Sequence, residues 1–285
     1  MSRYFDPTND FSFKKIFSNE ARLKDFLNVM LDLPDALKIV SITYLPTNTI
    51  PEVYDAKRSF FDLKVKDQSN NWYIIEMQKR SERDYIKRVQ YYSCHSYVEQ
   101  LKTGIRHSDL LPVIVVSIML GKLFPNDVPC ISHHKILETT TNTQHLYDLS
   151  YVFIELGKYD LSIKSPKDEW MHLFKCAEKE DSPPSMIKND QVISCYDVLE
   201  TYKWTTEERD AFIRAKLFED TQDINLSEEY NKGHAEGHTE GEHKRATEIA
   251  NKMLKRGDGI CEIIDVTGLS KEEVEDIVLI EKSKG

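Results

Sequence analysis

Several residue types and segments that identify special protein classes are scarce in this sequence of 285 residues. Glycine and proline number only ten each while aromatic residues make up 10%, which excludes collagen-like and fully disordered chains. The longest apolar run, PVIVVSIML at residues 112–120, is too short to span a bilayer, for which about 20 residues are needed. We therefore expect no membrane-spanning helix, and we interpret this run as a buried strand.

Cysteine is also scarce, and its pattern argues against a secreted, disulfide-bonded protein. The five cysteines are scattered, odd in number and never in CxxC spacing, so a disulfide framework is not expected. The first ten residues, MSRYFDPTND, contain no apolar segment of the kind found in secretion signals. Both observations predict a cytoplasmic protein.

Positive charge is in the minority, because the chain carries a net charge of −10. The distribution is uneven: residues 1–110 contain 17 Lys+Arg and 15 Asp+Glu, whereas residues 111–285 contain 21 and 33. A globally basic surface for nucleic acid is therefore excluded. The first third of the chain can still meet a phosphate backbone locally.

What is present is an ordered succession of predicted helices and strands. Apolar residues recur at three- and four-residue steps over residues 10–33, which predicts two helices broken near Ser18 and ended by Pro34. A further helix is expected over residues 83–102, and nearly all patterns after residue 167 are helical. Strands are expected at residues 39–45, 59–66, 72–79, 112–120 and 151–156. This order predicts a mixed α/β core followed by a helical C-terminal extension.

A change in composition late in the chain predicts two domains, residues 1–205 and residues 206–285. Residues 206–229 contain eight acidic and three basic side chains, which is typical of a solvated helix face or a linker. Glycine then recurs every four residues between 233 and 241, and the ending has a helix-turn-helix rhythm. Its last helix is too acidic to read DNA, so we interpret the ending as an oligomerisation or docking hairpin.

The strongest chemical signal lies in two alternating segments, residues 59–66 and 72–79, joined by a polar turn at 67–71. An antiparallel hairpin with this five-residue turn opposes residues whose numbers sum to 138, which places Asp62 opposite Glu76. The other face of the hairpin is entirely apolar and is expected to lie against the core: Phe61, Leu63, Val65, Tyr73, Ile75 and Met77.

Two directly opposed carboxylates repel one another, because their Cβ atoms lie roughly 5 Å apart. A shared proton or a cation between them relieves the repulsion. Carboxylate oxygens and water are ligands that suit Mg²⁺ or Mn²⁺ rather than zinc. Gln78 shares the acidic face, the main-chain carbonyl of Met77 is near, and Asp10 would join them if the first helix packs across the sheet.

These residues carry a resemblance to a known family. The spacing D-x13-E-x-Q, formed by Asp62, Glu76 and Gln78 in FFDLKVKDQSNNWYIIEMQKR, resembles the PD-(D/E)xK nuclease superfamily. More narrowly, the chain resembles the Rpn family of recombination-promoting nucleases, also called PD-(D/E)xK nuclease family transposases. NDFSFKKIF at residues 9–17 is similar to the family's opening segment, and YIKRVQYYSCHSYVEQLKTG at residues 85–104 is similar to the helix after its catalytic hairpin.

The resemblance implies an α/β fold with a PD-(D/E)xK restriction-endonuclease-like core, in which helices flank a mixed sheet. It also implies a DNA endonuclease of the recombination-promoting or transposase type that uses Mg²⁺ or Mn²⁺. Carried over by position, Asp62, Glu76 and the carbonyl of Met77 would bind the metal. Asp10 and Gln78 would complete the catalytic set.

The chain departs from the superfamily pattern at two positions. Phe61 stands where the superfamily name expects proline, and Gln78 stands where better-known members have lysine. Because glutamine carries no positive charge, activation of the attacking water would depend on the metal. Lys64 projects from the same face of the predicted hairpin and is a candidate to replace part of that charge.

Cationic and aromatic side chains in and after the hairpin are candidates for contacts to the DNA backbone. They are Lys64, Lys79, Arg83, Arg88 and Tyr92. None of them indicates how bases would be read.

Two other functions were weighed against the nuclease. A catalytically inactive, nuclease-like interaction or scaffold protein would show no metal dependence, and its oligomers would depend on residues 230–285. A transposase with an RNase H-like site needs three acids on separated strands, which the hairpin does not provide. In every case we expect a homo-oligomer formed through the C-terminal helices.

Overall fold

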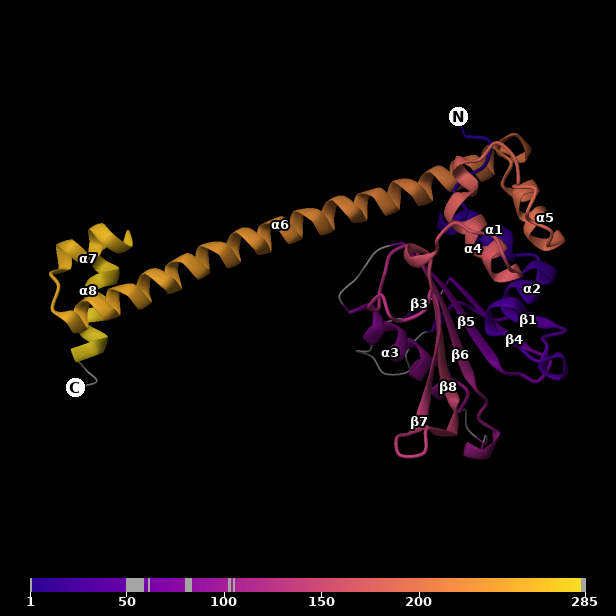
Figure 1. The fold of residues 1–285 in the computed structure, drawn as a ribbon, viewed down its shortest axis with the longest axis horizontal. Helices are drawn as coiled ribbons and strands as arrows, with labels where there is room; N and C mark the ends of the chain where they lie inside the picture. The colour runs from indigo at the N-terminus through magenta and orange to yellow at the C-terminus, as the bar shows by residue number, and fades with distance from the viewer. Residues whose placement is uncertain are drawn as a thin grey trace. The chain divides into compact units, whose positions relative to one another are not determined.

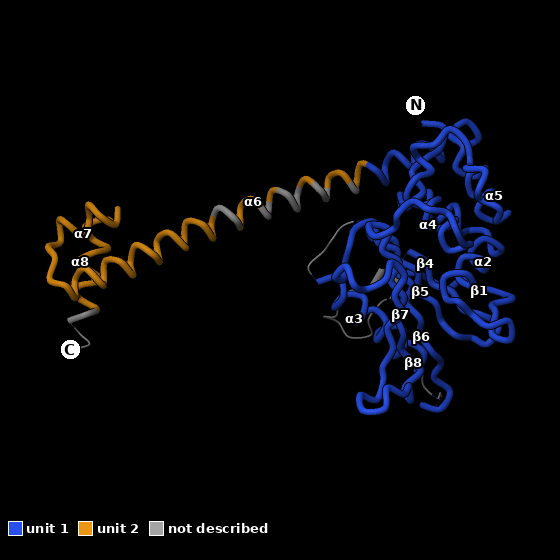
Figure 2. Tube along the Cα trace, viewed as in Figure 1, with its two compact units in different colours: residues 1–216 blue, residues 217–285 orange. Residues whose placement is uncertain are grey.

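The structure is a computed structural model that describes residues 2–49, 59–60, 62–79, 84–101, 104 and 106–282 (Figure 1). The chain divides into two compact units, Met1–Lys216 and Leu217–Gly285 (Figure 2). Helix α6 begins at Thr206, where the sequence predicts the second domain to begin, and it continues across the division between the units. None of the helices in the described part of the chain combines the length and apolar character of a membrane span.

A mixed six-stranded sheet forms the centre of the first unit. Its strands, in spatial order, are β1 (Ile42–Tyr44), β4 (Leu63–Asp67), β5 (Trp72–Gln78), β6 (Val113–Met119), β8 (Thr143–Glu155) and β7 (Ile131–Glu138). Strands β5, β6 and β8 run parallel to one another, and the remaining neighbours are antiparallel. A separate pair is formed by β2 (Asn48–Thr49) and β3 (Ser59–Phe60).

Eight α-helices accompany the strands in the described part of the chain. They are α1 (Asp10–Phe17), α2 (Glu20–Leu31), α3 (Tyr85–Val98), α4 (Pro166–Cys176), α5 (Asp190–Leu199), α6 (Thr206–Arg256), α7 (Ile260–Thr267) and α8 (Lys271–Lys282). Short 3-10 helices are η1 (Asp35–Leu37), η2 (His107–Asp109), η3 (Leu156–Lys158), η4 (Ala177–Lys179) and η5 (Thr201–Lys203). The predicted helices before the sheet and at the C-terminal end are therefore confirmed.

Side-chain oxygens begin several of these helices where the sequence predicts a start. Asn9 accepts a hydrogen bond from the N–H of Phe11 at α1, and Asn19 accepts one from Arg22 at α2. These N-cap contacts satisfy amides that lack a partner inside the helix. Helix α2 ends at Asp32, whose φ of 56° reverses the chain two residues before Pro34.

The sheet has an apolar cluster on each face, because alternate residues of a strand point to opposite sides. Helices α1, α2, α4 and α5 pack on one face, where Leu63, Val65 and Ile75 are buried. Helix α3 packs on the other, against Ile74 and Val115. The predicted core face of the hairpin is confirmed for the described residues, while Phe61 lies outside them. The opposite face is also covered, since α3 lies across it.

The predicted hairpin register is correct. Lys64 pairs with Ile74 and Val65 pairs with Tyr73, so opposed residue numbers sum to 138 as the turn length requires. The turn itself places Asn70 at a φ of 60°, a left-handed conformation that asparagine tolerates well.

Several strands differ from the sequence-based expectation. Strand β2 was not predicted, and residues 59–66, predicted as one strand, contribute to both β3 and β4. Strand β8 begins at Thr143, eight residues before the predicted start, and β7 was not predicted. The two pair as a long antiparallel hairpin whose register shifts around Ile136. These shifts interrupt the alternation of apolar and polar side chains from which strands are predicted.

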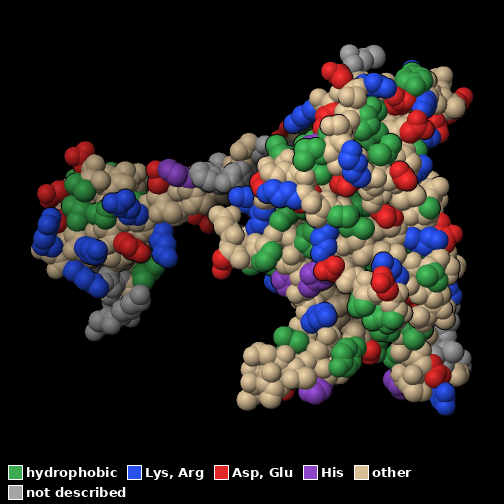
Figure 3. All heavy atoms as spheres, turned by 45° about the vertical axis from the view of Figure 1, so that its right-hand side comes forward, with side chains coloured by type: hydrophobic (Ala, Val, Ile, Leu, Met, Phe, Trp, Pro, Cys, Tyr) green, Lys and Arg blue, Asp and Glu red, His purple; other side chains and the backbone are tan. Residues whose placement is uncertain are grey.

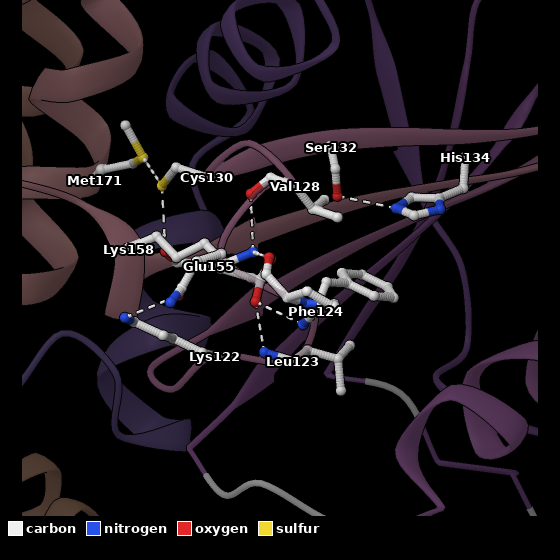
Figure 4. Close-up of polar contacts among 12 residues, drawn as sticks. Lys122, Leu123, Phe124, Val128, Cys130, Ser132, His134, Glu155, Lys158 and Met171 are labelled. Carbon is white, nitrogen blue, oxygen red and sulfur yellow. Dashed lines mark hydrogen bonds and ion pairs between the residues drawn. The ribbon is translucent and has the colours of Figure 1, made fainter.

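A buried carboxylate, Glu155, closes the carboxyl end of β8 (Figure 4). Its Oε1 accepts hydrogen bonds from the main-chain N–H groups of Leu123 and Phe124, and its Oε2 lies 2.7 Å from Nζ of Lys158. Both oxygens are therefore paired, and the segment that follows β6 is tied to β8. The backbones also meet closely here, since a Cβ on Gly157 would lie 2.8 Å from the carbonyl carbon of Gly121.

In the second unit, the end of α6 packs with α7 and α8 around a small apolar cluster. Its buried members are Ala250, Met253, Ile263, Leu269 and Val274. Helix α7 ends at Gly268 with a φ of 69°, a left-handed turn that glycine adopts without strain. The predicted helix-turn-helix ending is confirmed.

Candidate active site

The two predicted acids meet at the carboxyl end of β5. Glu76 lies on β5, and Asp62 directly precedes β4, opposite Glu76 in the hairpin register. Oδ2 of Asp62 accepts a hydrogen bond from the main-chain N–H of Met77 at 2.6 Å. This bond holds the aspartate against the neighbouring strand, and the charge of Asp62 acts on Glu76.

Burial makes the charged form of both acids unfavourable. It raises the pKa of Asp62 to about 6, with the nearby charge of Asp10 adding to the rise and the N–H of Met77 opposing it. Burial also raises the pKa of Glu76 well above its ordinary value, and the charge of Asp62 adds to that effect. Two coupled carboxylates in a cleft or strand end are a recurrent sign of a functional site.

Glu76 has a further feature that a structural carboxylate normally lacks. Its Oε1 is buried and has no hydrogen-bond partner among the residues that the structure describes. Leaving a buried polar atom without a partner costs about 1–3 kcal/mol, more for a charged group. An oxygen of this kind, beside a second carboxylate, fits a divalent cation that would bind to both.

Gln78 lies two residues after Glu76 and points to the same side of the sheet. The side chain is buried, and its Oε1 accepts a hydrogen bond of 2.8 Å from Nη2 of Arg88 on α3. The guanidinium of Arg88 also lies 5.1 Å from the ring centre of Tyr85, within cation–π range. Its charge favours the ionised forms of both Asp62 and Glu76.

Asp10, at the start of α1, lies near enough for its charge to raise the pKa of Asp62. It forms an ion pair of 2.7 Å with Lys14, one turn later on the same helix. The charge of Lys14 also acts on Asp62 and Glu76. Helix α1 therefore carries an acid and a base whose charges act on the acidic pair, and the catalytic role of Asp10 stays a prediction.

Two residues at the site were not predicted from the sequence. Ser117 on β6 is buried opposite Glu76 in the parallel register. Tyr85 begins α3, and burial together with the charge of Glu76 raises the pKa of its hydroxyl. Serine within an apolar strand and tyrosine at a helix start are common, so neither carried a signal that sequence reasoning could use.

The structure distributes the predicted DNA-contacting residues differently. Lys64 is only 2% exposed, its ammonium pairs with Glu99 after α3, and burial lowers its pKa. This arrangement does not support the expectation that Lys64 contacts DNA or replaces a charge at the acidic pair. Lys64 lies on the predicted face of the hairpin, but the sequence did not predict that α3 covers this face and buries it.

The other candidates are spread around the site. Lys79 forms an ion pair of 2.9 Å with Asp6, and Tyr92 packs partly buried against the apolar cluster beneath α3. Arg88 donates a hydrogen bond to Gln78, which shares a face of the sheet with Glu76, and its charge acts on both acids. Arg83 lies outside the described residues.

Among the described residues, no group of three or more His, Cys, Asp or Glu side chains is arranged to hold a metal ion, so a metal would rely on the acidic pair and a main-chain oxygen.

Comparison with known proteins identifies the family to which the chain belongs. No curated protein and no solved structure matches the chain. A family model described as PD-(D/E)XK nuclease family transposase matches residues 7–225. Together with the mixed sheet and the D-x13-E-x-Q hairpin, this match shows that the chain belongs to the PD-(D/E)XK nuclease family transposases.

Proposed function

We propose that this protein is a metal-dependent DNA endonuclease that hydrolyses phosphodiester bonds. The observation that carries the proposal is the pairing of Asp62 with Glu76, whose buried Oε1 has no partner in the described part of the chain. A fold with no use for this pair would gain stability by replacing one acid with a neutral side chain. A binding site for a cation explains why both remain.

The residues present fit Mg²⁺ or Mn²⁺. Asp62 and Glu76 would hold the ion, with the main-chain carbonyl of Met77 as a further ligand, and hard oxygen donors are what these ions prefer. When bound, the ion polarises a phosphate oxygen and lowers the pKa of a bound water. The acids contribute position, since the Asp62–Met77 bond fixes one carboxylate and β5 fixes the other.

Asp10 and Gln78 complete the proposed catalytic set. The charge of Asp10 acts on Asp62, and we propose that this third carboxylate orients water or the ion's hydration shell. Gln78 contributes a neutral amide, whose oxygen is engaged by Arg88. Neither residue needs to change protonation for the reaction to proceed.

Contacts to the DNA backbone are proposed for individual cations rather than for a broad basic surface. Figure 3 shows Lys and Arg side chains interspersed with Asp and Glu on the visible face, and neither sign dominates. Lys14, Lys79 and Arg88 flank the acidic pair or follow it in the chain. A bound phosphate would therefore meet positive charge only close to the site.

The direct test uses covalently closed circular DNA, because nicking or linearisation shows internal cleavage and excludes an enzyme that needs ends. Purified protein is incubated with Mg²⁺, Mn²⁺ or a chelator. We expect nicked or linear product only with metal, and none from Glu76→Gln. The control is Glu178→Gln, which alters an exposed acid on η4 and should cleave like the unaltered protein.

Equal cleavage by the unaltered protein and Glu76→Gln would refute the proposed site. Absence of cleavage and of metal binding by the unaltered protein would instead favour the alternative, a catalytically inactive interaction or scaffold protein. Metal binding is read separately, as a shift in melting temperature on adding Mn²⁺.

We also propose that the C-terminal helices join copies of this chain. A Cβ built on Gly233, Gly237 or Gly241 of α6 would meet no heavy atom within 4 Å in the described part of the chain, which leaves this ridge open to another helix. Apolar side chains of α7 and α8, Val266, Leu279 and Ile280, are also at least half exposed. Light scattering should show an oligomer that becomes a monomer when residues 230–285 are removed.

A further inference from the structure

We propose that Arg88 supplies the positive charge that Gln78 lacks, and that Gln78 positions it beside the two acids. This inference rests on the proposed nuclease function and names one catalytic cation and one positioning residue within it. It also explains how a glutamine can stand where other members of the superfamily have lysine.

The contact between these residues links two elements. Gln78 ends β5 and Arg88 lies in the first turn of α3, and their side chains are joined by the 2.8 Å bond between Oε1 and Nη2. An amide oxygen is neutral, so this bond orients the guanidinium without cancelling its charge, as a carboxylate would. The buried amide gains the partner that its oxygen requires.

A second contact fixes the guanidinium from the helix side. Arg88 lies over the ring of Tyr85, three residues earlier on α3, at 5.1 Å from the ring centre. Tyr85 is itself buried near Glu76, whose charge raises the pKa of its hydroxyl. The cation is thus held between a strand and a helix that both border the acidic pair.

The charge of Arg88 reaches the reaction centre. It acts on both Asp62 and Glu76, so it also acts on a phosphate bound beside them. A preorganised guanidinium is suited to the negative charge that grows on phosphate oxygens in the transition state. Lys14 acts on the same acids from α1, where it pairs with Asp10.

The experiment moves the positive charge from position 88 to position 78. Cleavage of closed circular DNA is measured under single-turnover conditions for Arg88→Gln, for Arg88→Lys, and for Arg88→Gln combined with Gln78→Lys. We expect a loss of about 100-fold in Arg88→Gln and partial activity in Arg88→Lys. The double variant, which puts an ammonium at position 78, should recover at least about tenfold over Arg88→Gln.

A double-mutant cycle tests the positioning role of Gln78. Gln78→Ala should lower the rate less than Arg88→Gln does, and it should add little in the Arg88→Gln background, because both changes disturb one interaction. Lys87→Gln is the matched control, since Lys87 is an exposed cation on the same turn of α3. It should stay within about threefold of the unaltered protein, and melting temperatures measured for every variant distinguish a lost catalytic charge from lost folding.

Three results would overturn the inference while the unaltered protein still cleaves. One is an Arg88→Gln rate within threefold of normal, and another is a larger loss from Lys14→Gln than from Arg88→Gln. The third is a weaker Kd for DNA in Arg88→Gln with no change in the single-turnover rate, which would make Arg88 a binding residue only. If the unaltered protein does not cleave, it is the proposed function that fails.

Discussion

Two glutamates, the buried Glu155 and the half-buried Glu76, lie at the carboxyl ends of parallel strands in the same sheet, and their surroundings are opposite. Glu155 on β8 has both oxygens paired, with two main-chain N–H groups and the ammonium of Lys158 (Figure 4). Glu76 on β5 lies opposite another acid, and its Oε1 is unpaired within the described residues. The Glu155 carboxylate stabilises the fold through its partners, whereas the charge of Asp62 acts unfavourably on an ionised Glu76.

The two glutamates show how a carboxylate that stabilises the fold differs from one that serves a function. A buried carboxylate with satisfied oxygens explains its own presence, since removing it leaves its partners unpaired. A buried carboxylate facing a second acid has no such explanation within the chain. The difference therefore supports the proposed cation site at β5 and gives no reason for one at β8, although both residues are glutamates of the same sheet.

The largest expected effect is loss of cleavage in Glu76→Gln, by about 1,000-fold or more, because the cation loses one of its two carboxylates. The free energy of unfolding without metal should stay equal or rise, since a repelled buried charge is removed. Urea unfolding and cleavage assays on the same preparation measure both. A variant that is both inactive and strongly destabilised would put Glu76 in the same class as Glu155.

The converse change is Glu155→Ala, which should lower the free energy of unfolding by about 3–5 kcal/mol by leaving Lys158 and two amides without their partner. Glu155→Gln should cost less, because an amide oxygen can still accept from both N–H groups. Below the melting temperature the folded fraction should cleave normally. A loss below about 1 kcal/mol in Glu155→Ala would contradict the structural role assigned to this residue.

A smaller effect is expected from the metal itself. Mn²⁺ at about 100 times its Kd should stabilise the unaltered protein by about 2.7 kcal/mol and raise the melting temperature by several degrees. Glu155→Gln should respond in the same way, whereas Glu76→Gln should not respond. Calorimetric scans with and without metal check this, and an equal response in all three proteins would place the ion elsewhere.

The smallest effect should follow Lys64→Met. Lys64 is buried and paired with Glu99. The change removes only one partner, but the Glu99 side chain is 36% exposed, so water can solvate its carboxylate and no buried charge is left unpaired. We expect cleavage within about threefold of normal and a change of about 1 kcal/mol or less in stability. A large loss of cleavage would indicate that Lys64 contributes to catalysis, and it would argue against Arg88 as the source of the catalytic positive charge.

Local patterns explain why the acidic hairpin could be predicted. The alternation of residues identified both strands, and the five-residue turn left one register, in which one face of the hairpin is entirely apolar. The pairing of Asp62 with Glu76 followed from that register alone. Helix starts at Asn9 and Asn19 were equally local, since a cap contacts its own first turn.

Other features depend on contacts between distant segments and were not predictable. Strand β7 pairs with β8 through an irregular register, and the two main-chain N–H groups that bind Glu155 lie more than thirty residues earlier in the chain. The burial of Lys64 depends on where α3 packs, which its own sequence does not specify. Tertiary packing overrides local preference in each case.

The amino-acid sequence by itself determined which residues could meet across one hairpin, because strand periodicity and turn length are local properties of the chain. Only the tertiary structure decided what surrounds them. Packing of α3 on the sheet brings Arg88 to Gln78 and seals Lys64 against Glu99, because burial and charge pairing depend on neighbours in space.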